Sequence, residues 1–428
     1  MSNLTICLTI FAACMLLFAW NRFPMSVVSL ATLLALVVTK CLKPQEALAG
    51  FGDTNNMIII TMFIVAAGLN RTTFTEKLSR FIVKWSRGSL KYAFLGYLIM
   101  AFFLTNFIFS PLAVFAIVFP MSLSLSETFH LEPSKTAYPL VVVAIVCCCA
   151  LPLSIAITNS GIYNGYLAEY GLSQYRMVPL DFMFARLPLA IVTLLWAYFY
   201  GFKHAPDRPV VPIEYHMAKT KEKKPLSPFG ELMGVVIFFG VIFLLITQQF
   251  HGIPTWVVTF GGACLTVFCG VLTEKEAIAA IPVSASTIYV GCLAMAKALT
   301  VTGAGDIVGA TVSQFLAGSH NGYLLGGIFF LVPFLLTQLM LNKAVIGIFI
   351  PIAILTCKAV GANPIGPILL AYSGALAAIL APMATPALPL AMSVGGYDQK
   401  ALLKQGWLLS ILLSVGYVFW VMTIYPAF

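Results

Sequence analysis

Long runs of apolar residues recur along the whole chain and constrain its fold more than any other feature. A helix needs about 20 residues to cross the hydrocarbon core of a bilayer. Because 60% of the 428 residues are apolar and 9% are charged, water cannot solvate the surface of such a chain. We therefore predict an all-α polytopic membrane protein and exclude a nucleic-acid-binding protein, a soluble enzyme and a secreted disulfide scaffold. The ten runs predicted to span lie near 4–20, 24–42, 56–69, 138–157, 182–202, 231–247, 254–272, 284–300, 366–384 and 406–426.

Two further apolar stretches, 89–125 and 322–358, are each interrupted midway by polar residues or proline. The interruptions contain Thr105-Asn106, Ser110-Pro111 and Asn342-Lys343. Each stretch is either two spans or one re-entrant hairpin that enters and leaves by the same face of the membrane.

Basic residues favour the hairpin interpretation. They gather in 71–91 and in the loop 203–229, which holds twice as many basic as acidic residues, and such segments face the cytoplasm. Both segments reach that side if 89–125 and 322–358 are hairpins, which places both termini outside. Arg186 then counts among the few basic residues on the outer side. Within 71–91, apolar residues at helical spacing predict an amphipathic surface helix, with an ordinary cytoplasmic loop as the alternative.

The two halves of the chain match at an offset of 230 residues. Pro24 and Pro254, Glu46 and Glu276, and Pro152 and Pro382 are three of the matching pairs. We predict a first repeat at 1–202, a basic cytoplasmic linker at 203–230 and a second repeat at 231–428. Five spans and one hairpin per half make the repeats opposite in orientation, as in many secondary transporters.

The ten cysteines predict neither a redox centre nor a metal site. No Cys-x-x-Cys and no His/Cys cluster occurs, so we interpret them as small packing residues and expect no metal or other cofactor. Residues 4–20 have no basic segment before them and no clear cleavage site, and we expect a retained helix rather than a signal peptide.

Three segments resemble one known family. Residues 341–351 (LNKAVIGIFIP) resemble the family pattern Ser-Asn-Thr-Ala-Thr followed by an apolar run and proline. Residues 380–397 (LAPMATPALPLAMSVGGY) resemble Pro-x-Ala-Thr-Pro-Pro-Asn followed by an apolar run and Gly-Tyr, and 64–78 resembles the stretch before the family's surface helix. Together they are similar to the divalent-anion/sodium symporters, the citrate and dicarboxylate transporters of the ion transporter superfamily.

The resemblance implies a homodimer with a scaffold and a mobile transport domain in each subunit, and a site formed by two hairpin tips and two unwound helices. The tips correspond to Ser110-Pro111-Leu112 and Leu341-Asn342-Lys343. The unwound segments correspond to Thr158-Asn159-Ser160-Gly161 and Thr385-Pro386-Ala387-Leu388. The candidate substrate-binding residues are therefore Ser110, Thr158, Asn159, Ser160, Asn342, Lys343, Thr385 and Pro386.

The tips depart from the family in residues that matter for sodium. Only Ser110 in the first tip and Asn342 in the second keep the family's oxygen-bearing side chains. Lys343 either binds a substrate carboxylate, replaces a missing sodium ion, or is a structural lysine that reaches the surface. Asn159 and Ser160 could alternatively cap a helix, and Thr385-Pro386 could be only a kink.

These residues favour the transport of a small organic anion. Helix N-termini at the tips carry partial positive charge, and the hydroxyl and amide side chains add hydrogen bonds. We expect a secondary transporter of di- or tricarboxylates such as succinate, malate or citrate, coupled to anion exchange or proton symport rather than to sodium. Its partners would be the anion, the lipid bilayer of the inner cell membrane and a second copy of the chain, with no nucleic acid.

Other functions remain as alternatives. Helix termini would bind sulfate or arsenite equally well. A cation/proton antiporter of the same superfamily is disfavoured because no Asp or Glu lies in the middle of a predicted span. A membrane-embedded enzyme is disfavoured by the scattered histidines, and a channel by the paired hairpins, which suit alternating access better.

Overall fold

The structure, a computed structural model, describes residues 3–20, 23–74, 77, 89–108, 110–129, 131–213, 226–303, 314, 321–383 and 385–428. Helices and their connections account for all of these residues, so the predicted all-α class is confirmed. By length and composition, six helices of the described chain can cross a bilayer, and eight shorter apolar helices accompany them. The chain is therefore a multi-pass membrane protein. The six are Pro44–Asn70, Leu90–Phe107, Pro179–His204, Pro228–Ile246, Asn342–Val360 and Gln399–Ile424.

The helices of the first half recur in the same order in the second half. The first series is α1 (Asn3–Trp20), α2 (Met25–Val38), α3 (Pro44–Leu48), α4 (Thr54–Asn70), α6 (Leu90–Phe107), α7 (Pro111–Phe129), α8 (Ala137–Val146), α9 (Ser154–Glu169) and α10 (Pro179–Leu195). The second is α12 (Pro228–Ile246), α14 (Thr255–Phe268), α15 (Glu274–Ala279), α16 (Val283–Val301), α18 (Gly322–Leu336), α19 (Asn342–Val360), α20 (Ile365–Leu376), α21 (Ala387–Gly395) and α22 (Gln399–Leu412).

Both series end with a π-helical segment. In the first half, Trp196–Gly201 continues α10. In the second, Leu413–Tyr417 continues α22 and leads into α23 (Val418–Ile424).

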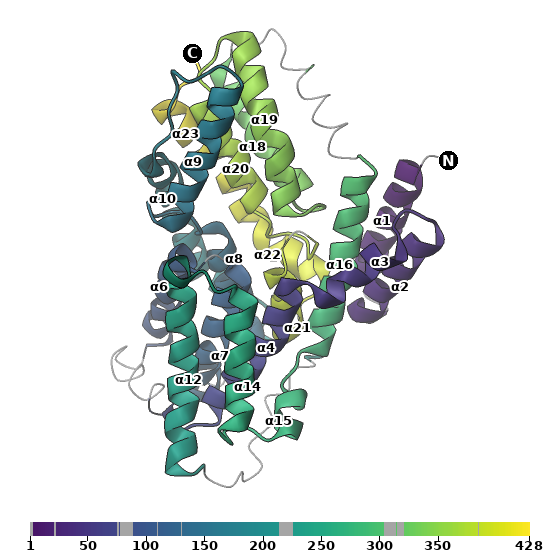
Figure 1. Cartoon of the computed structure of the whole chain (residues 1–428), viewed down its shortest axis with the longest axis vertical. Coiled ribbons are helices and arrows are strands. Elements are labelled where there is room, and N and C mark those ends of the chain that lie inside the picture. The colour runs from purple at the N-terminus through teal and green to yellow at the C-terminus, as the bar shows by residue number, and fades with distance from the viewer. Residues whose placement is uncertain are drawn as a thin grey trace.

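The early helices of the two halves pack against each other. α2 lies against α16, and α4 lies against α14, with α1 and α12 beside them (Figure 1). The approach of α2 to α16 is close, because a Cβ added at Gly291 would lie 2.5 Å from the carbonyl oxygen of Ser29. This cross-packing joins the halves into one body.

Ion pairs connect the halves reciprocally. Arg71, at the end of α4, pairs with Glu276 of α15, and Lys297 of α16 lies 3.8 Å from Glu46 of α3. Glu46 and Glu276 are a matching pair in the sequence. Equivalent acidic residues therefore reach across to the opposite half.

Each of the two interrupted stretches forms two helices, as expected. The first interruption, at 108–110, separates α6 from α7, and the second, at 337–341, separates α18 from α19. In Figure 1, α18, α19 and α20 gather at the end that carries the C-terminus.

Eight of the ten predicted spans coincide with helices, but 138–157 and 366–384 are not single helices. α8 ends at Val146 and α9 begins at Ser154, and α20 ends at Leu376 and α21 begins at Ala387. We call residues 147–153 the first break and residues 377–386 the second break. Pro152 and Pro382 lie in the two breaks, where proline needs no hydrogen-bonding partner for a backbone N–H.

Two further predictions concern residues that are mostly outside the described ranges. The amphipathic surface helix expected within 71–91 and most of the linker at 203–230 belong to this group.

Candidate functional site

The last turn of α6 holds the first break through the amide side chain of Asn106. Asn106 Nδ2 donates to the carbonyl oxygen of Cys147 at 3.2 Å. Its Oδ1 accepts from the backbone N–H groups of Ala150 and Leu151, at 2.8 and 2.9 Å. Asn106 is 1% exposed, so these bonds replace water for backbone groups that no helix satisfies.

The turn between α18 and α19 holds the second break in the same way. Gln338 Nε2 donates to the carbonyl oxygen of Ala377 at 3.1 Å, and its Oε1 accepts from the backbone N–H of Leu380 at 2.9 Å. Gln338 lies in the turn between α18 and α19. A longer side chain here performs the task of Asn106 in the first half.

A threonine beside each amide adds a second bond. Thr105 Oγ1 donates to the carbonyl oxygen of Ala144, and Thr337 Oγ1 lies within hydrogen-bond distance of that of Ala375, both at 2.6 Å. The first pair thus attaches the end of α6 to the last turn of α8 and the first break. The second pair attaches the turn after α18 to the last turn of α20 and the second break.

The first break carries one more support, the fully buried Arg186 of α10. Its Nε and Nη2 donate to the carbonyl oxygens of Cys148 and Val146, each at 2.9 Å. Its Nη1 donates to Ser373 Oγ at 2.7 Å, and the guanidinium lies 5.4 Å from the centre of the Tyr372 ring. Arg186 is 1% exposed and lies inside the protein, while the side of the membrane on which it lies stays a prediction.

Arg186 joins the two broken helices, because Ser373 and Tyr372 belong to α20 while the carbonyl oxygens belong to α8 and its break. Asn159 of α9 strengthens the junction by donating from Nδ2 to the Tyr372 hydroxyl at 2.8 Å. The positions where α8 and α20 end therefore lie close together.

The second break is supported by neutral donors only, within the described residues. The Tyr138 hydroxyl donates to the carbonyl oxygen of Ile379 at 2.9 Å, and Gln399 Nε2 donates to that of Leu380 at 2.6 Å. With Gln338, these side chains satisfy three carbonyl groups without a charge.

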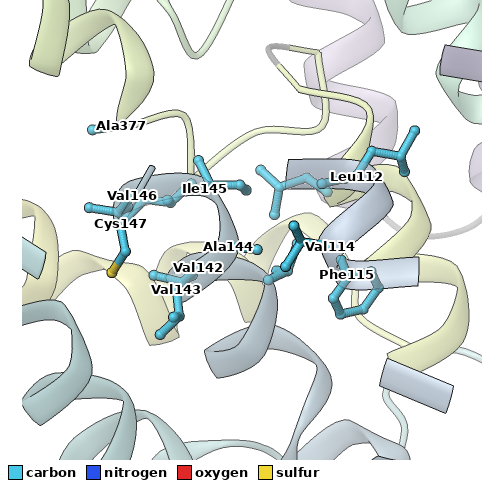
Figure 2. Close-up of a cluster of buried hydrophobic side chains, with 14 of the residues drawn as sticks. Leu112, Val114, Phe115, Val142, Val143, Ala144, Ile145, Val146, Cys147 and Ala377 are labelled. Atoms are coloured by element: carbon cyan, nitrogen blue, oxygen red, sulfur yellow. The ribbon is translucent and has the colours of Figure 1, made fainter. Parts of the chain in front are cut away.

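Buried apolar side chains pack beside the first break. Figure 2 shows Leu112, Val114 and Phe115 of α7 in one cluster with residues 142–147 of α8 and its end, and with Ala377 of the second break. Because apolar side chains exclude water here, the hydrogen bonds of both breaks form in a low-dielectric environment.

The predicted tip residues lie at the starts of helices. Ser110 Oγ accepts from the Ala113 N–H at 3.2 Å, at the start of α7. Asn342 is the first residue of α19, and its Oδ1 is 2.8 Å from Thr337 Oγ1. Lys343 follows it, is exposed, and makes no hydrogen bond or ion pair within the part of the chain that the structure describes.

The position expected for the first unwound segment is wrong. Residues 158–161 lie inside α9, where Thr158 is exposed and Asn159 is half-buried. Ser160 is buried and donates to the carbonyl oxygen of Ile157 at 2.8 Å, a bond within the helix. The break lies several residues earlier, in the apolar 147–153, because Asn106 and Arg186 supply from outside the polar partners that this segment lacks.

The second unwound segment agrees in part. Thr385 is buried in the second break, and Pro386 is the residue before the first turn of α21. Ala387 and Leu388 are already helical.

Four helices begin at these points: α7 and α19 at the tips, and α9 and α21 after the breaks. Each N-terminus carries about half a positive charge, which favours an anion. Among the described residues, no group of three or more His, Cys, Asp and Glu side chains could hold a metal ion.

Arg186 is the functional candidate that the sequence predictions missed. A lone arginine within the apolar run 182–202 was the available signal, since an ionisable residue inside a membrane segment marks function by default.

Comparisons with known proteins identify similar transporters. A family model described as citrate transporter matches residues 15–250. The chain is 24% identical to an uncharacterized transporter of Haemophilus influenzae over 91% of this chain and 85% of that protein. It is 23% identical to the sodium-dependent dicarboxylate transporter SdcS of Staphylococcus saprophyticus, over 92% and 81% respectively. The similarity to the uncharacterized transporter YfbS of Escherichia coli, at 24% identity, covers 47% of this chain and 33% of that protein.

Proposed function

Because the chain belongs to the citrate transporter family, we propose that it is a secondary active transporter of small organic anions that works by alternating access. The substrates would be di- or tricarboxylates such as succinate, malate or citrate. The dicarboxylate named for the Staphylococcus saprophyticus relative supports this substrate class.

One observation carries the proposal. In both halves of the chain, an amide and a threonine beside the α6–α7 or the α18–α19 connection hold a helix break. Asn106 and Thr105 serve the first break, and Gln338 and Thr337 serve the second. Discontinuous helices that meet in this way form the substrate sites of many secondary transporters. Irregular backbone at membrane depth is tolerated where protein or a water-filled cavity satisfies it.

The charges at the tips suit an anion. The exposed Lys343 stands in the first turn of α19, where its ammonium adds a full positive charge to that of the helix N-terminus. Ser110, Asn342, Thr158 and Thr385 would add hydrogen bonds to the carboxylate oxygens.

The arrangement in the membrane is part of the proposal. The α6–α7 and α18–α19 hairpins would be re-entrant, and 1–202 and 231–428 would be inverted repeats joined by a cytoplasmic linker at 203–230. The protein would act in the inner cell membrane as a homodimer.

Uptake of labelled succinate into proteoliposomes tests the function. Sodium-free vesicles would be either preloaded with succinate or empty, and citrate and sulfate would be tested in parallel. Uptake only into preloaded vesicles is the expected result and identifies an exchanger. Uptake that requires a proton or sodium gradient identifies a symporter instead. Transport of sulfate but of no carboxylate contradicts the proposed substrate class.

A further inference from the structure

Arg186 places a permanent positive charge where the first broken helix ends. Val146, whose carbonyl oxygen accepts from Nη2, is the last residue of α8, and Cys148 lies in the break itself. The last carbonyl groups of a helix have no partner within the helix and carry about half a negative charge. In discontinuous membrane helices, such carbonyl groups coordinate the coupling cation.

The guanidinium has no acidic partner within the described residues. Its nearest polar contacts are two carbonyl oxygens and the Ser373 hydroxyl, and the Tyr372 ring lies beneath it. A fully buried charge without a counter-ion is costly unless oriented dipoles compensate for it. The end of α8 supplies those dipoles, so the break and the charge stabilise each other.

Among the described residues, the side chains that donate to the carbonyl groups of the second break are all neutral. Gln338, Tyr138 and Gln399 each donate to one carbonyl oxygen of the second break. The charge is therefore a particular property of the first break, and general demands of a helix break do not explain it.

We propose that the Arg186 guanidinium occupies the cation position of the first break, so that this break is formed without a bound coupling ion. The inference rests on the proposed transport function and deepens it by assigning the coupling at this site. Arg186 is a positioning residue here: it shapes the break and does not touch the substrate, since its side chain is fully buried.

The variant R186Q tests the proposal because glutamine keeps hydrogen-bond donors but removes the charge. The full chain would be purified and its melting temperature measured in sodium chloride and in choline chloride of equal ionic strength. We expect sodium to raise the melting temperature of R186Q by about 3–5 °C through binding at the vacated position, and to leave the wild type unchanged. This readout needs no substrate, so it stands even if carboxylate transport fails.

Uptake in proteoliposomes gives the second readout. We expect the sodium-free rate of R186Q to fall about tenfold and sodium to restore part of it, while wild-type uptake stays independent of sodium. The exposed Arg176, in the loop before α10, gives the matched control R176Q, which should behave as wild type in both salts.

Several outcomes would overturn the proposal. R186Q that has the same stability in both salts, including a protein that folds in neither, would give Arg186 a purely structural role. Wild-type protein that sodium stabilises as strongly as it stabilises R186Q would mean that the cation site lies elsewhere. R186K tests the charge directly, and its stability should not respond to sodium.

Discussion

Ser286 donates a hydrogen bond to Asn56 at 2.6 Å, and these two residues are 230 positions apart, the offset that relates the two halves of the sequence. Both are buried, one at the start of α4 and the other at the start of α16. The contact therefore joins α4 of the first half to α16 of the second.

A double-mutant cycle on this pair measures its contribution. We expect S286A and N56A each to lower the free energy of unfolding, with a coupling energy of about 0.6 kcal/mol, typical of hydrogen bonds in membrane proteins. Denaturant unfolding in detergent gives the four values. Strict additivity of the two changes would show that the contact contributes nothing.

Removal of the Asn106 side chain, which holds the first break, should destabilise the protein more than removal of the Gln338 side chain, which holds the second. N106A leaves the N–H groups of Ala150 and Leu151 without partners, whereas Q338A leaves only that of Leu380. We expect N106A to lower the free energy of unfolding by about 2–4 kcal/mol and Q338A by about 1–3 kcal/mol. Both variants should lose most of their uptake in proteoliposomes. Equal stability of N106A and wild type would show that the hydrogen bonds of Asn106 do not stabilise the first break.

Gly374 lets α20 approach α18. A Cβ at this position would lie 2.4 Å from the carbonyl oxygen of Phe330, so G374A must displace the backbone. We expect a destabilisation of about 1–3 kcal/mol, measured as a lower melting temperature. G327A, on α18 itself, is the matched control because nothing lies within 4 Å of its added Cβ.

Lys343 gives a test of anion binding. If its exposed ammonium contacts a substrate carboxylate, K343T should raise the KM for succinate about tenfold or more and change kcat little. K358T, in the last turn of the same helix, removes a lysine that donates to the Tyr170 carbonyl oxygen and should leave KM unchanged. Unchanged uptake of K343T would remove Lys343 from the site.

The hairpin tips could be predicted from the sequence because polar residues and proline stand out in an apolar run. Thr105-Asn106 and Asn342 interrupt such runs, and the structure places them beside the connections between helices, in the last turn of α6 and at the first position of α19. The first break is marked by Pro152 alone, since the other side chains from Cys147 to Leu153 are apolar. Its polar partners, Asn106 and Arg186, are distant in sequence, and only the tertiary fold brings them there.

The polar residues at 158–161 led to the wrong prediction of an unwound segment. Hydroxyl side chains can bond within their own helix, as Ser160 does to Ile157, so polar residues alone do not unwind a segment. The role of Arg186 could not be predicted either, because the carbonyl groups that accept its hydrogen bonds cannot be read from the sequence.

The side chains that hold the two breaks also bear on the proposed transport movement. Asn106 and Gln338 give the broken backbone its partners from within the protein, and buried apolar side chains surround them. Backbone groups that are hydrogen-bonded to protein side chains in this way need neither lipid headgroups nor water at a particular depth. Under the proposed alternating access, these backbone groups would keep their partners inside the protein while the helices move.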